Sequence, residues 1–454
     1  MAEPLRAGAA QLDITPLLGT ALAGSFHPRP AQDVDDPLYA KALVLESGAT
    51  RLAIVALDLI SILRQDVQTI RALVAERVGI PPQNVMIGCT HTHTGPATRS
   101  SHSVTRDESY MEWLVYRVAD SVQMAARRLR PVRIAWGKGE QHDISFCRRY
   151  RMRDGTVRMN PGRGNPDIVE PTSPIDPTVG VLYVEDLDGR PVAVLAQFSL
   201  HYVGTDNSHA ISADYYGHFA AVMRRHLGEE CLPLLLNGTS GQINNVNPFD
   251  PNQERGHAQA RRVASALAGE VLKVMGRMRL QETAVLGALA TEVELRRKEV
   301  TEEDVRIAQQ ILAGNDPLPG KGPFSYVVGQ PIPEALRPVY AAHVPRLYAM
   351  PPTITSEVQV LRIGESAWVA LPGEIFVEIG LAIKQQAPVP DTFVVGLAND
   401  SLGYIATDKA LTLEGGYETW AGTGTPVGLG AERVLTEAAV KLLGELFRGG
   451  AVAS

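Results

Sequence analysis

Short apolar runs alternate along the chain with segments whose apolar residues recur at helical spacing, and this alternation constrains the fold more than any other feature. The run RLAIVALDLI at 51–60 is typical of a buried strand. The segment QDVQTIRALVAERVG follows it, with the apolar stripe of an amphipathic helix and a glycine stop at Gly79. A further strand, NVMIGC, comes next. Strands that alternate with helices in this way predict an α/β fold.

Several other expected strands mix polar and apolar residues, as TSEVQVLRI at 355–363 does, so we expect some antiparallel pairing. The sequence therefore predicts large mixed β-sheets flanked by helices. Further helices are expected near 214–227, 254–275, 302–313, 375–386 and 431–447. Residues 315–350, in contrast, begin with a tract rich in proline and glycine and are interpreted as a long loop. Such a loop is either a lid over a site or a plain surface connector.

The composition limits the classes of partner. A net charge of −7 argues against a broad nucleic-acid surface. No apolar run approaches the ~18 residues that a membrane span needs, and the N-terminus, MAEPLRAGAAQLDITP, lacks the pattern of a signal peptide. We therefore expect a cytoplasmic bacterial protein with a small-molecule partner. Its three cysteines are too scattered for a disulfide framework or a cysteine zinc site, and are expected to be buried free thiols.

The motif CTHTHTGP at 89–96 carries the first candidate site. In an extended segment, His91 and His93 would point to the same side, just past the end of an apolar strand. Sites are common at strand ends in α/β sheets, and histidines are frequent zinc ligands. The spacing is equally compatible with a pair of hydrogen-bonded loop histidines.

Three more segments carry candidate side chains. His201 ends the apolar strand of FSLHYVG, Glu374 follows a Pro-Gly turn in LPGEIF, and Tyr404 lies in the irregular loop NDSLGYIAT. The first two have a plainer interpretation. A lone histidine is more often structural than a ligand, and a glutamate at the start of a helix interacts favourably with the helix dipole.

Taken together and in this order, these motifs resemble the neutral ceramidase family, which comprises the neutral/alkaline non-lysosomal ceramidases and shorter bacterial homologues. The segments GAAQLDITP and DPLYAKALVLESG extend the resemblance over nearly the whole chain, and HTHTGP is its most specific part. The resemblance implies a catalytic zinc ion held by His91, His201, Glu374 and Tyr404. Two imidazoles, one carboxylate and one phenolic oxygen suit zinc, with a position left for water.

The resemblance also implies the chemistry. Bound zinc can lower the pKa of its water from about 15.7 to about 7 and can polarise a carbonyl group. Amide cleavage additionally needs a proton for the departing nitrogen. His93 is interpreted as a neighbour of that water, or as an oxyanion stabiliser, and not as a ligand. It is the candidate for proton transfer, with Tyr404 or Tyr417 assisting.

An arginine position of the family falls within DISFCRRYRMRDGTVRMNPG at 143–162, with Cys147 where the family has asparagine. Arg148 matches the arginine and is expected to bind a substrate carbonyl oxygen or carboxylate with its planar fork. Arg149 is a rival for that role. A solvated basic run is the alternative interpretation, since five arginines lie between 148 and 158.

One family motif is altered in this chain. Ceramidases carry Gly-Asp-Val-Ser-Pro-Asn, whereas the matching stretch here is NGTSGQINNVNP, with Gln242 for the aspartate and Asn244 for the serine. A covalent route through a serine at that position is therefore not available, and direct attack by metal-activated water is favoured. Asn244 and Asn245 are candidates for donating hydrogen bonds to an oxyanion, or else they hold the loop. Gln242 is a candidate for contacting the substrate.

Further departures concern the substrate. The chain ends after AERVLTEAAVKLLGELF, so we expect no C-terminal β-sandwich domain of the kind that secreted ceramidases carry. Because no segment for docking on lipid is evident either, a small soluble amide or lactam is a better expected substrate than ceramide in a membrane. Asp214, in SADYYGHF, either orients a ligand histidine or is an acidic residue at a helix N-terminus.

Ligands spread from residue 91 to residue 404 predict one large catalytic domain over 1–454. The leading hypothesis is a zinc hydrolase that cleaves a carbon–nitrogen bond, amide or lactam, in a small soluble substrate. One alternative keeps the metal but changes the reaction to that of an esterase, lactonase or deacetylase on a polar substrate. The other is a metal-binding protein without turnover. The sequence makes no prediction of the oligomeric state.

Overall fold

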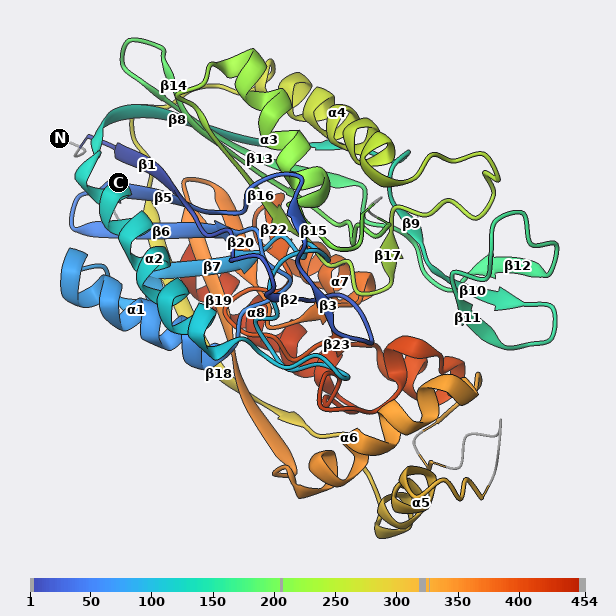
Figure 1. Cartoon of the computed structure of the whole chain (residues 1–454). Helices are drawn as coiled ribbons and strands as arrows, with labels where there is room; N and C mark the ends of the chain where they lie inside the picture. The colour runs from blue at the N-terminus through green and yellow to red at the C-terminus, as the bar shows by residue number, and fades with distance from the viewer. Residues whose placement is uncertain (1–3, 205–206, 318–323, 326, 449–454) are drawn as a thin grey trace.

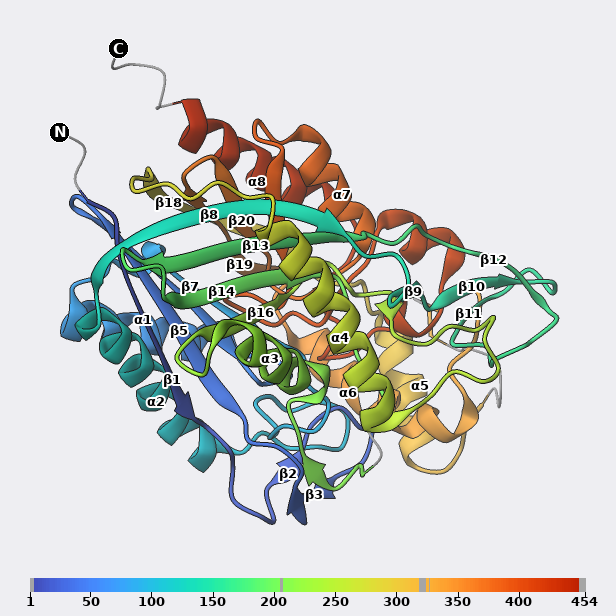
Figure 2. The same cartoon turned by 90° about the horizontal axis from the view of Figure 1, so that it is seen from above.

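Two β-sheets pack face to face and carry the architecture. The computed structural model describes residues 4–204, 207–317, 324–325 and 327–448. The larger sheet has eight strands in the order β16-β14-β13-β8-β1-β5-β6-β7 (Figures 1 and 2). Its central strands pair antiparallel, and parallel pairs form its two edges. The strands are β1 (Arg6–Asp13), β5 (Tyr39–Ser47), β6 (Thr50–Leu57), β7 (Val85–Cys89), β8 (Arg130–Glu140), β13 (Thr178–Asp186), β14 (Pro191–Phe198) and β16 (Leu232–Asn237).

The smaller sheet has four strands in the order β18-β19-β20-β22, antiparallel except for the parallel pair β20–β22. Apolar side chains from the facing surfaces of both sheets form one core, in which Trp368 and Phe393 of the smaller sheet join Leu182 and Leu195 of the larger. Burial on both sides explains the continuous apolar run at 51–60. The predicted α/β fold with large mixed sheets is confirmed. The strands of the smaller sheet are β18 (Leu286–Arg296), β19 (Thr353–Ile363), β20 (Ser366–Ala370) and β22 (Asp391–Val395).

Helices cover the outer faces of both sheets (Figure 2). α1 and α2 pack on one half of the larger sheet, α3 and α4 pack on its other half, and α7 and α8 cover the smaller sheet. The amphipathic spacing explains this arrangement, since Val67, Ile70 and Val74 on one side of α1 are buried. The helices are α1 (Arg64–Val78), α2 (Glu108–Arg127), α3 (Asp214–Leu227), α4 (Gly256–Met275), α7 (Val377–Gln386) and α8 (Ala431–Arg448).

Short strands and two further helices lie in the connections between these layers. The two helices, α5 and α6, pack on each other beside the smaller sheet (Figure 1). These elements are β2 (Ala21–Leu22), β3 (Arg29–Pro30), β4 (Asp33–Val34), β9 (Phe146–Cys147), β10 (Arg149–Met152), β11 (Val157–Met159), β12 (Ile168–Pro171), β15 (Ala210–Ile211), β17 (Ile243–Asn244), β21 (Glu374–Ile375), β23 (Tyr404–Ile405), α5 (Glu302–Leu312) and α6 (Arg337–Ala349).

The prediction of a loop over 315–350 is wrong for the second half of this segment, which forms α6. Pro338 stands in the first turn of this helix, where the missing N–H of a proline leaves no hydrogen bond unmade. Pro345 lies inside the helix. Because proline is typical of loops, these two residues led to the prediction of a loop where the chain forms a helix. Residues 318–323 and 326 of the expected loop lie outside the described residues, and the lid remains a prediction.

The cysteines behave as the sequence predicts. Cys89, Cys147 and Cys231 are buried free thiols. Burial raises the pKa of Cys89 and of Cys231, which makes these thiols weak nucleophiles. Among the helices that the structure describes, none combines the length and apolarity that crossing a bilayer requires.

The contact between the two sheets at Gly180 gives a test of their packing. A β-carbon on Gly180 of β13 would lie 2.4 Å from the ring of Phe393 in β22, which is closer than a van der Waals contact. We expect Gly180→Ala to lower the free energy of unfolding by about 1–3 kcal/mol through overpacking, as measured by urea denaturation. Gly269→Ala is the matched control, because an added β-carbon in this part of α4 has no neighbouring atom within 4 Å. Equal effects of the two substitutions would contradict the described packing.

Candidate active site

The four side chains predicted as metal ligands come from four separate connections. His91 follows β7, His201 follows β14, and Glu374 and Tyr404 follow β20 and β22 in the short strands β21 and β23. β21 and β23 pair in parallel, with Glu374 opposite Tyr404. Connections that are far apart in the sequence therefore converge beyond the strand ends, as in many α/β sites.

His91 has a left-handed backbone with φ = 74°, so the extended segment expected from the His-x-His spacing is wrong. This conformation is uncommon outside glycine and is found at functional sites. Nδ1 of His91 lies 2.7 Å from the carbonyl oxygen of Ile60. Because a carbonyl oxygen accepts, Nδ1 carries the proton and Nε2 keeps a lone pair for another partner. The rings of His91 and His93 still come together, with centroids 5.0 Å apart.

A buried carboxylate faces this lone pair. Glu374 Oε2 lies 3.4 Å from His91 Nε2 and 3.7 Å from His201 Nδ1, and it has no hydrogen-bond partner among the described residues. Burial raises the pKa of Glu374, but positive charge on His91 and Arg148 outweighs this effect and lowers the pKa to about 2. When His91 is instead neutral, with its one proton on Nδ1, two acceptors face each other here. A cation between them would satisfy both, and imidazole with carboxylate is a donor set that fits zinc.

Three histidines gather around the same point. Nitrogen atoms of His91, His93 and His201 lie within 4.8 Å of one another, and Nε2 of His93 is 2.7 Å from Nε2 of His201. Burial lowers the pKa of His93 to about 3 and that of His201 well below its ordinary value. The neutral imidazole, which is the form that binds metals, is therefore favoured. The cluster can hold a metal ion, and it adds His93 to the candidate ligands.

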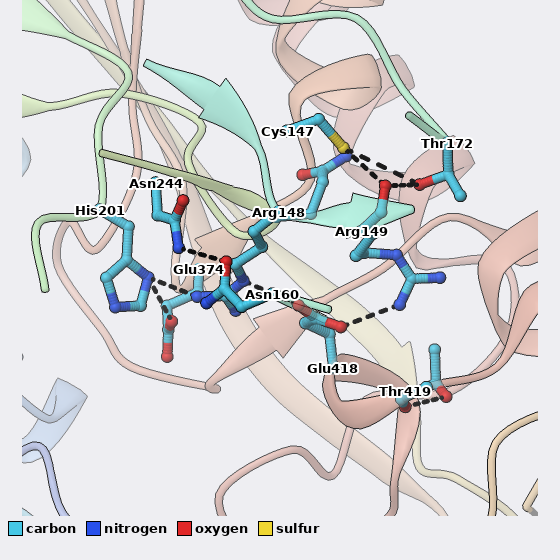
Figure 3. Close-up of polar contacts among 12 residues, drawn as sticks. Cys147, Arg148, Arg149, Asn160, Thr172, His201, Asn244, Glu374, Glu418 and Thr419 are labelled. Carbon is cyan, nitrogen blue, oxygen red and sulfur yellow. Dashed lines mark hydrogen bonds and ion pairs between the residues drawn. The ribbon is translucent and has the colours of Figure 1, made fainter. Parts of the chain in front are cut away.

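Arg148 connects His201 to a buried glutamate that the sequence analysis missed (Figure 3). Its Nε donates to Glu418 Oε1 at 2.8 Å, and one terminal nitrogen donates to His201 Nδ1 at 3.1 Å. The other terminal nitrogen is buried and has no hydrogen-bond partner among the residues that the structure describes. Because arginine only donates, His201 Nδ1 accepts and its Nε2–H donates to His93. A metal ion bound by His201 would replace one of these two bonds.

A cavity of about 130 Å³ opens beside the cluster. Five of the predicted site residues line it: His91, His93, Glu374, Tyr404 and Tyr417. Burial raises the pKa of Tyr417 to about 12 and that of Tyr404 well above its ordinary value, so both phenols keep their protons at neutral pH. Polar residues that the sequence analysis missed form much of the remaining wall: Arg99, His102, Tyr340 and His343.

Arg149 does not line this cavity. It lies buried between Glu414 and Glu418, which are 3.2 Å and 2.9 Å from its terminal nitrogens. Its charge is thus paired inside the protein, which corrects the predicted contact with substrate. Burial of Arg148 and Arg149 also excludes a solvated basic run at these two positions. Glu418 could be noticed in the sequence only as one glutamate in an irregular loop, which is too weak a signal to assign.

The side chains of the altered family motif also form hydrogen bonds within the protein. Gln242, Asn244 and Asn245 each use both ends of the side-chain amide on other protein groups, and none of them lines the cavity. Asn245 exchanges two hydrogen bonds with the backbone of Val203, and Asn244 donates to Asn160 at 3.0 Å. These three side chains hold the loop, and the predicted contacts with an oxyanion or substrate are corrected.

The backbone of His93 is fixed from two sides. Asp214 Oδ2 accepts from His93 N at 3.1 Å, and Arg29 donates to the carbonyl oxygen of His93 at 2.8 Å. Asp214 opens α3 with φ = 54°. It is therefore the acidic residue at a helix N-terminus, and it positions the main chain of His93 instead of a ligand imidazole.

Comparison with known proteins adds to this geometry. The family model for neutral/alkaline non-lysosomal ceramidases, N-terminal, matches residues 6–235. The chain belongs to this family. The match covers the segments of His91 and His201, whereas Glu374 and Tyr404 lie beyond it. The family that the sequence motifs suggested is confirmed.

Two relatives named as neutral ceramidases agree with this family assignment. The neutral ceramidase of Pseudomonas aeruginosa is 26% identical over 450 residues, which is 84% of this chain and 64% of that relative. Neutral ceramidase A of Dictyostelium discoideum is 24% identical over 158 residues, which is 33% of this chain and 21% of that relative. This chain thus spans less than two thirds of either relative's length in these matches.

Solved structures show the same fold. The crystal structure of neutral ceramidase from Pseudomonas aeruginosa superposes with a TM-score of 0.72 at 20% identity, covering 100% of this chain and 76% of that one. A ceramidase structure complexed with C2 gives the same values. At this identity the similarity concerns the fold.

Single substitutions test the metal centre. We expect His91→Ala and Glu374→Gln to reduce bound zinc from about one ion per chain to a small fraction of that, because each leaves too few ligands. His93→Gln should keep its zinc if His93 is a neighbour of the metal and lose it if His93 is a ligand. Zinc per chain is measured by mass spectrometry after dialysis, with the exposed His226→Ala as control. Full zinc content in His91→Ala would contradict the centre.

Asp214 makes the stability depend on pH. Burial raises its pKa from 3.8 to about 7, although the backbone hydrogen bond of His93 acts against this. The folded protein therefore holds this proton more tightly than the unfolded chain. The stabilisation is complete below about pH 4 and is lost as the pH rises through 7.

We expect the free energy of unfolding of the wild type to fall more steeply between pH 4 and pH 7 than that of Asp214→Asn, by up to roughly 1.4 kcal/mol per pH unit. The asparagine mimics the protonated acid and cannot titrate. Urea denaturation of metal-free protein at several pH values measures the difference. Parallel curves for the two proteins would show that Asp214 is ionised in the folded state.

Proposed function

We propose that the chain is a zinc-dependent hydrolase that cleaves a carbon–nitrogen bond, in an amide or lactam, of a small soluble substrate by metal-activated water. The observation that carries this proposal is the buried Glu374 Oε2, which has no hydrogen-bond partner in the described part of the chain and faces His91 and His201 beside a cavity. Family membership supports the reaction class, since the named relatives are ceramidases.

His91, His201, Glu374 and Tyr404 would hold the ion. When bound, zinc supplies a water whose pKa falls to about 7 and polarises the carbonyl group under attack. Nδ1–H of His91 donates to the carbonyl oxygen of Ile60, which fixes the ring with Nε2 toward Glu374. The ligands are thereby oriented before substrate arrives.

The remaining steps belong to the chain's own residues. His93 lines the cavity next to His91, so its imidazole is the group placed to accept a proton from water and return it to the departing nitrogen. Tyr417 keeps its phenolic proton and can donate a hydrogen bond from the same wall. Arg148 does not line the cavity, so its role is to hold His201 through the hydrogen bond to Nδ1.

The size of the cavity favours a small substrate. Its volume is about 130 Å³, whereas an engineered cavity of about 150 Å³ in another protein binds benzene. A molecule with one ring or a few carbon atoms on either side of the scissile bond fits this space better than a long acyl chain does. An ester or lactone would meet the same residues, so a matched pair of amide and ester substrates distinguishes the two reactions.

Chelation and re-addition test the proposal. We expect a pair of matched substrates, an anilide and the corresponding phenyl ester, to be hydrolysed by zinc-loaded protein. Prolonged chelation should reduce the activity at least about 100-fold, and added zinc should restore it. A preference for the ester in kcat/KM beyond their difference in intrinsic reactivity would favour the esterase. Turnover that survives complete removal of the metal would contradict the mechanism, and full zinc content without turnover would indicate a binding protein.

A further inference from the structure

One wall of the cavity carries an arginine that forms no ion pair with any carboxylate of the described residues. Arg99, in the connection between β7 and α2, lines the cavity. One of its terminal nitrogens donates to Ser401, to Oγ at 2.8 Å and to the carbonyl oxygen at 3.2 Å. Within the described part of the chain, Arg99 pairs with no carboxylate. The remaining donors of its guanidinium are therefore available to a ligand.

The two nearest acids are occupied elsewhere. Glu374 faces His91 and His201, and a metal ion bound there would neutralise it. Asp400 accepts from the backbone of Ser401 at 2.7 Å and from Ser356 at 2.7 Å. Arg99 is partly buried, and a charge that is partly removed from water is stabilised by pairing with an opposite charge. An unpaired arginine on a cavity wall thus indicates that an anion completes it.

The groups beside Arg99 suit such a ligand. His102 Nδ1 is buried, and no described residue forms a hydrogen bond with it. The ring of His343 lies 5.8 Å from that of His102, and its Nδ1 is 2.8 Å from Thr423 Oγ1. Phe26 packs against His102 with ring centroids 4.4 Å apart and adds an apolar surface. Apart from Glu374, every residue on this wall is neutral or basic.

We propose that the substrate is a small amide that carries a carboxylate away from the scissile bond, and that Arg99 binds this carboxylate. The planar fork of arginine matches a carboxylate in two parallel hydrogen bonds. His102 provides a further hydrogen-bonding nitrogen on the same wall. The carbonyl group of the substrate then lies toward His91 and Glu374, which line the same cavity. This inference rests on the proposed function for the reaction, but the anion site itself can be tested without turnover.

Binding tests the anion site. Benzoate and benzyl alcohol have nearly the same size, and one of them is charged. We expect zinc-loaded protein to bind benzoate more tightly, and Arg99→Gln to weaken benzoate binding about 10- to 100-fold while affecting benzyl alcohol much less. Isothermal titration calorimetry measures both. If Arg99→Gln binds benzoate as the wild type does, the carboxylate goes to the metal or elsewhere, and the inference is wrong.

Turnover tests the substrate class. We expect the wild type to prefer N-acetylglycine over N-acetylethanolamine in kcat/KM, and Arg99→Gln to reduce this ratio at least about tenfold. If Arg99 only supported the turn at Ser401, both substrates would lose activity alike and the ratio would not change, which would overturn the inference. If neither substrate is hydrolysed, the result counts against the proposed function, and benzoate binding still decides the role of Arg99.

Two further variants serve as controls for these experiments. Arg99→Lys keeps the charge without the fork, so it should retain part of the preference for the carboxylate. If Arg99→Gln does not fold stably, Arg99→Lys replaces it in the same measurements. Arg279→Gln removes an exposed arginine outside the cavity and should leave the preference unchanged. Equal loss of preference in Arg279→Gln and Arg99→Gln would point to net charge alone and overturn the assignment.

Discussion

The site depends on one buried contact, that of the Glu374 carboxylate with the imidazoles of His91 and His201. An ionised oxygen without a hydrogen bond is unfavourable in a protein interior unless a positive charge accompanies it. The surrounding geometry maintains this arrangement. Ile60 fixes the ring of His91, and the pairing of β21 with β23 holds Glu374 beside Tyr404. The fold thereby holds a negatively charged carboxylate on the cavity wall, where a cation would stabilise it.

A second layer of charge supports this contact. Arg148 reaches His201 on one side and Glu418 on the other, and Glu418 also binds Arg149. Such networks are stable only when all their members are satisfied. Among the described residues, one terminal nitrogen of Arg148 and Nε of Arg149 are both buried without a hydrogen-bond partner. The two arginines, which the sequence could not tell apart, differ in their partners. Arg148 reaches His201, whereas Arg149 pairs with Glu414 and Glu418.

The sequence predicted the architecture because apolar periodicity reports burial. Strands buried on both faces gave continuous apolar runs, and the stripe of Val67, Ile70 and Val74 marked a helix. α6 was missed because its stability comes from packing that outweighs two prolines. The proposed ligands could be predicted because each lies in a sequence motif that resembles the family. The structure brings these motifs together.

Other parts of the site had no local signal. Whether the amide of Asn244 faces a cavity or a neighbouring loop depends on backbone torsions that a residue type does not specify. Arg99 and His343 are separated by more than two hundred positions along the chain. Only the folded molecule shows that they share a wall. Ion pairs such as Arg149 with Glu418 likewise join segments that no periodic pattern relates.

The helical pair α5 and α6 has a consequence for how selectivity is encoded. It is inserted between β18 and β19, and it has an apolar core of its own with Trp420. Tyr340 and His343 of α6 reach the cavity, whereas Arg99 and the candidate metal ligands come from the sheet connections. One part of the cavity wall is thus built on a separately packed insert. Exchange of this insert between homologues could retune which molecules are accepted while the reactive centre stays intact, which makes the fold adaptable by module replacement.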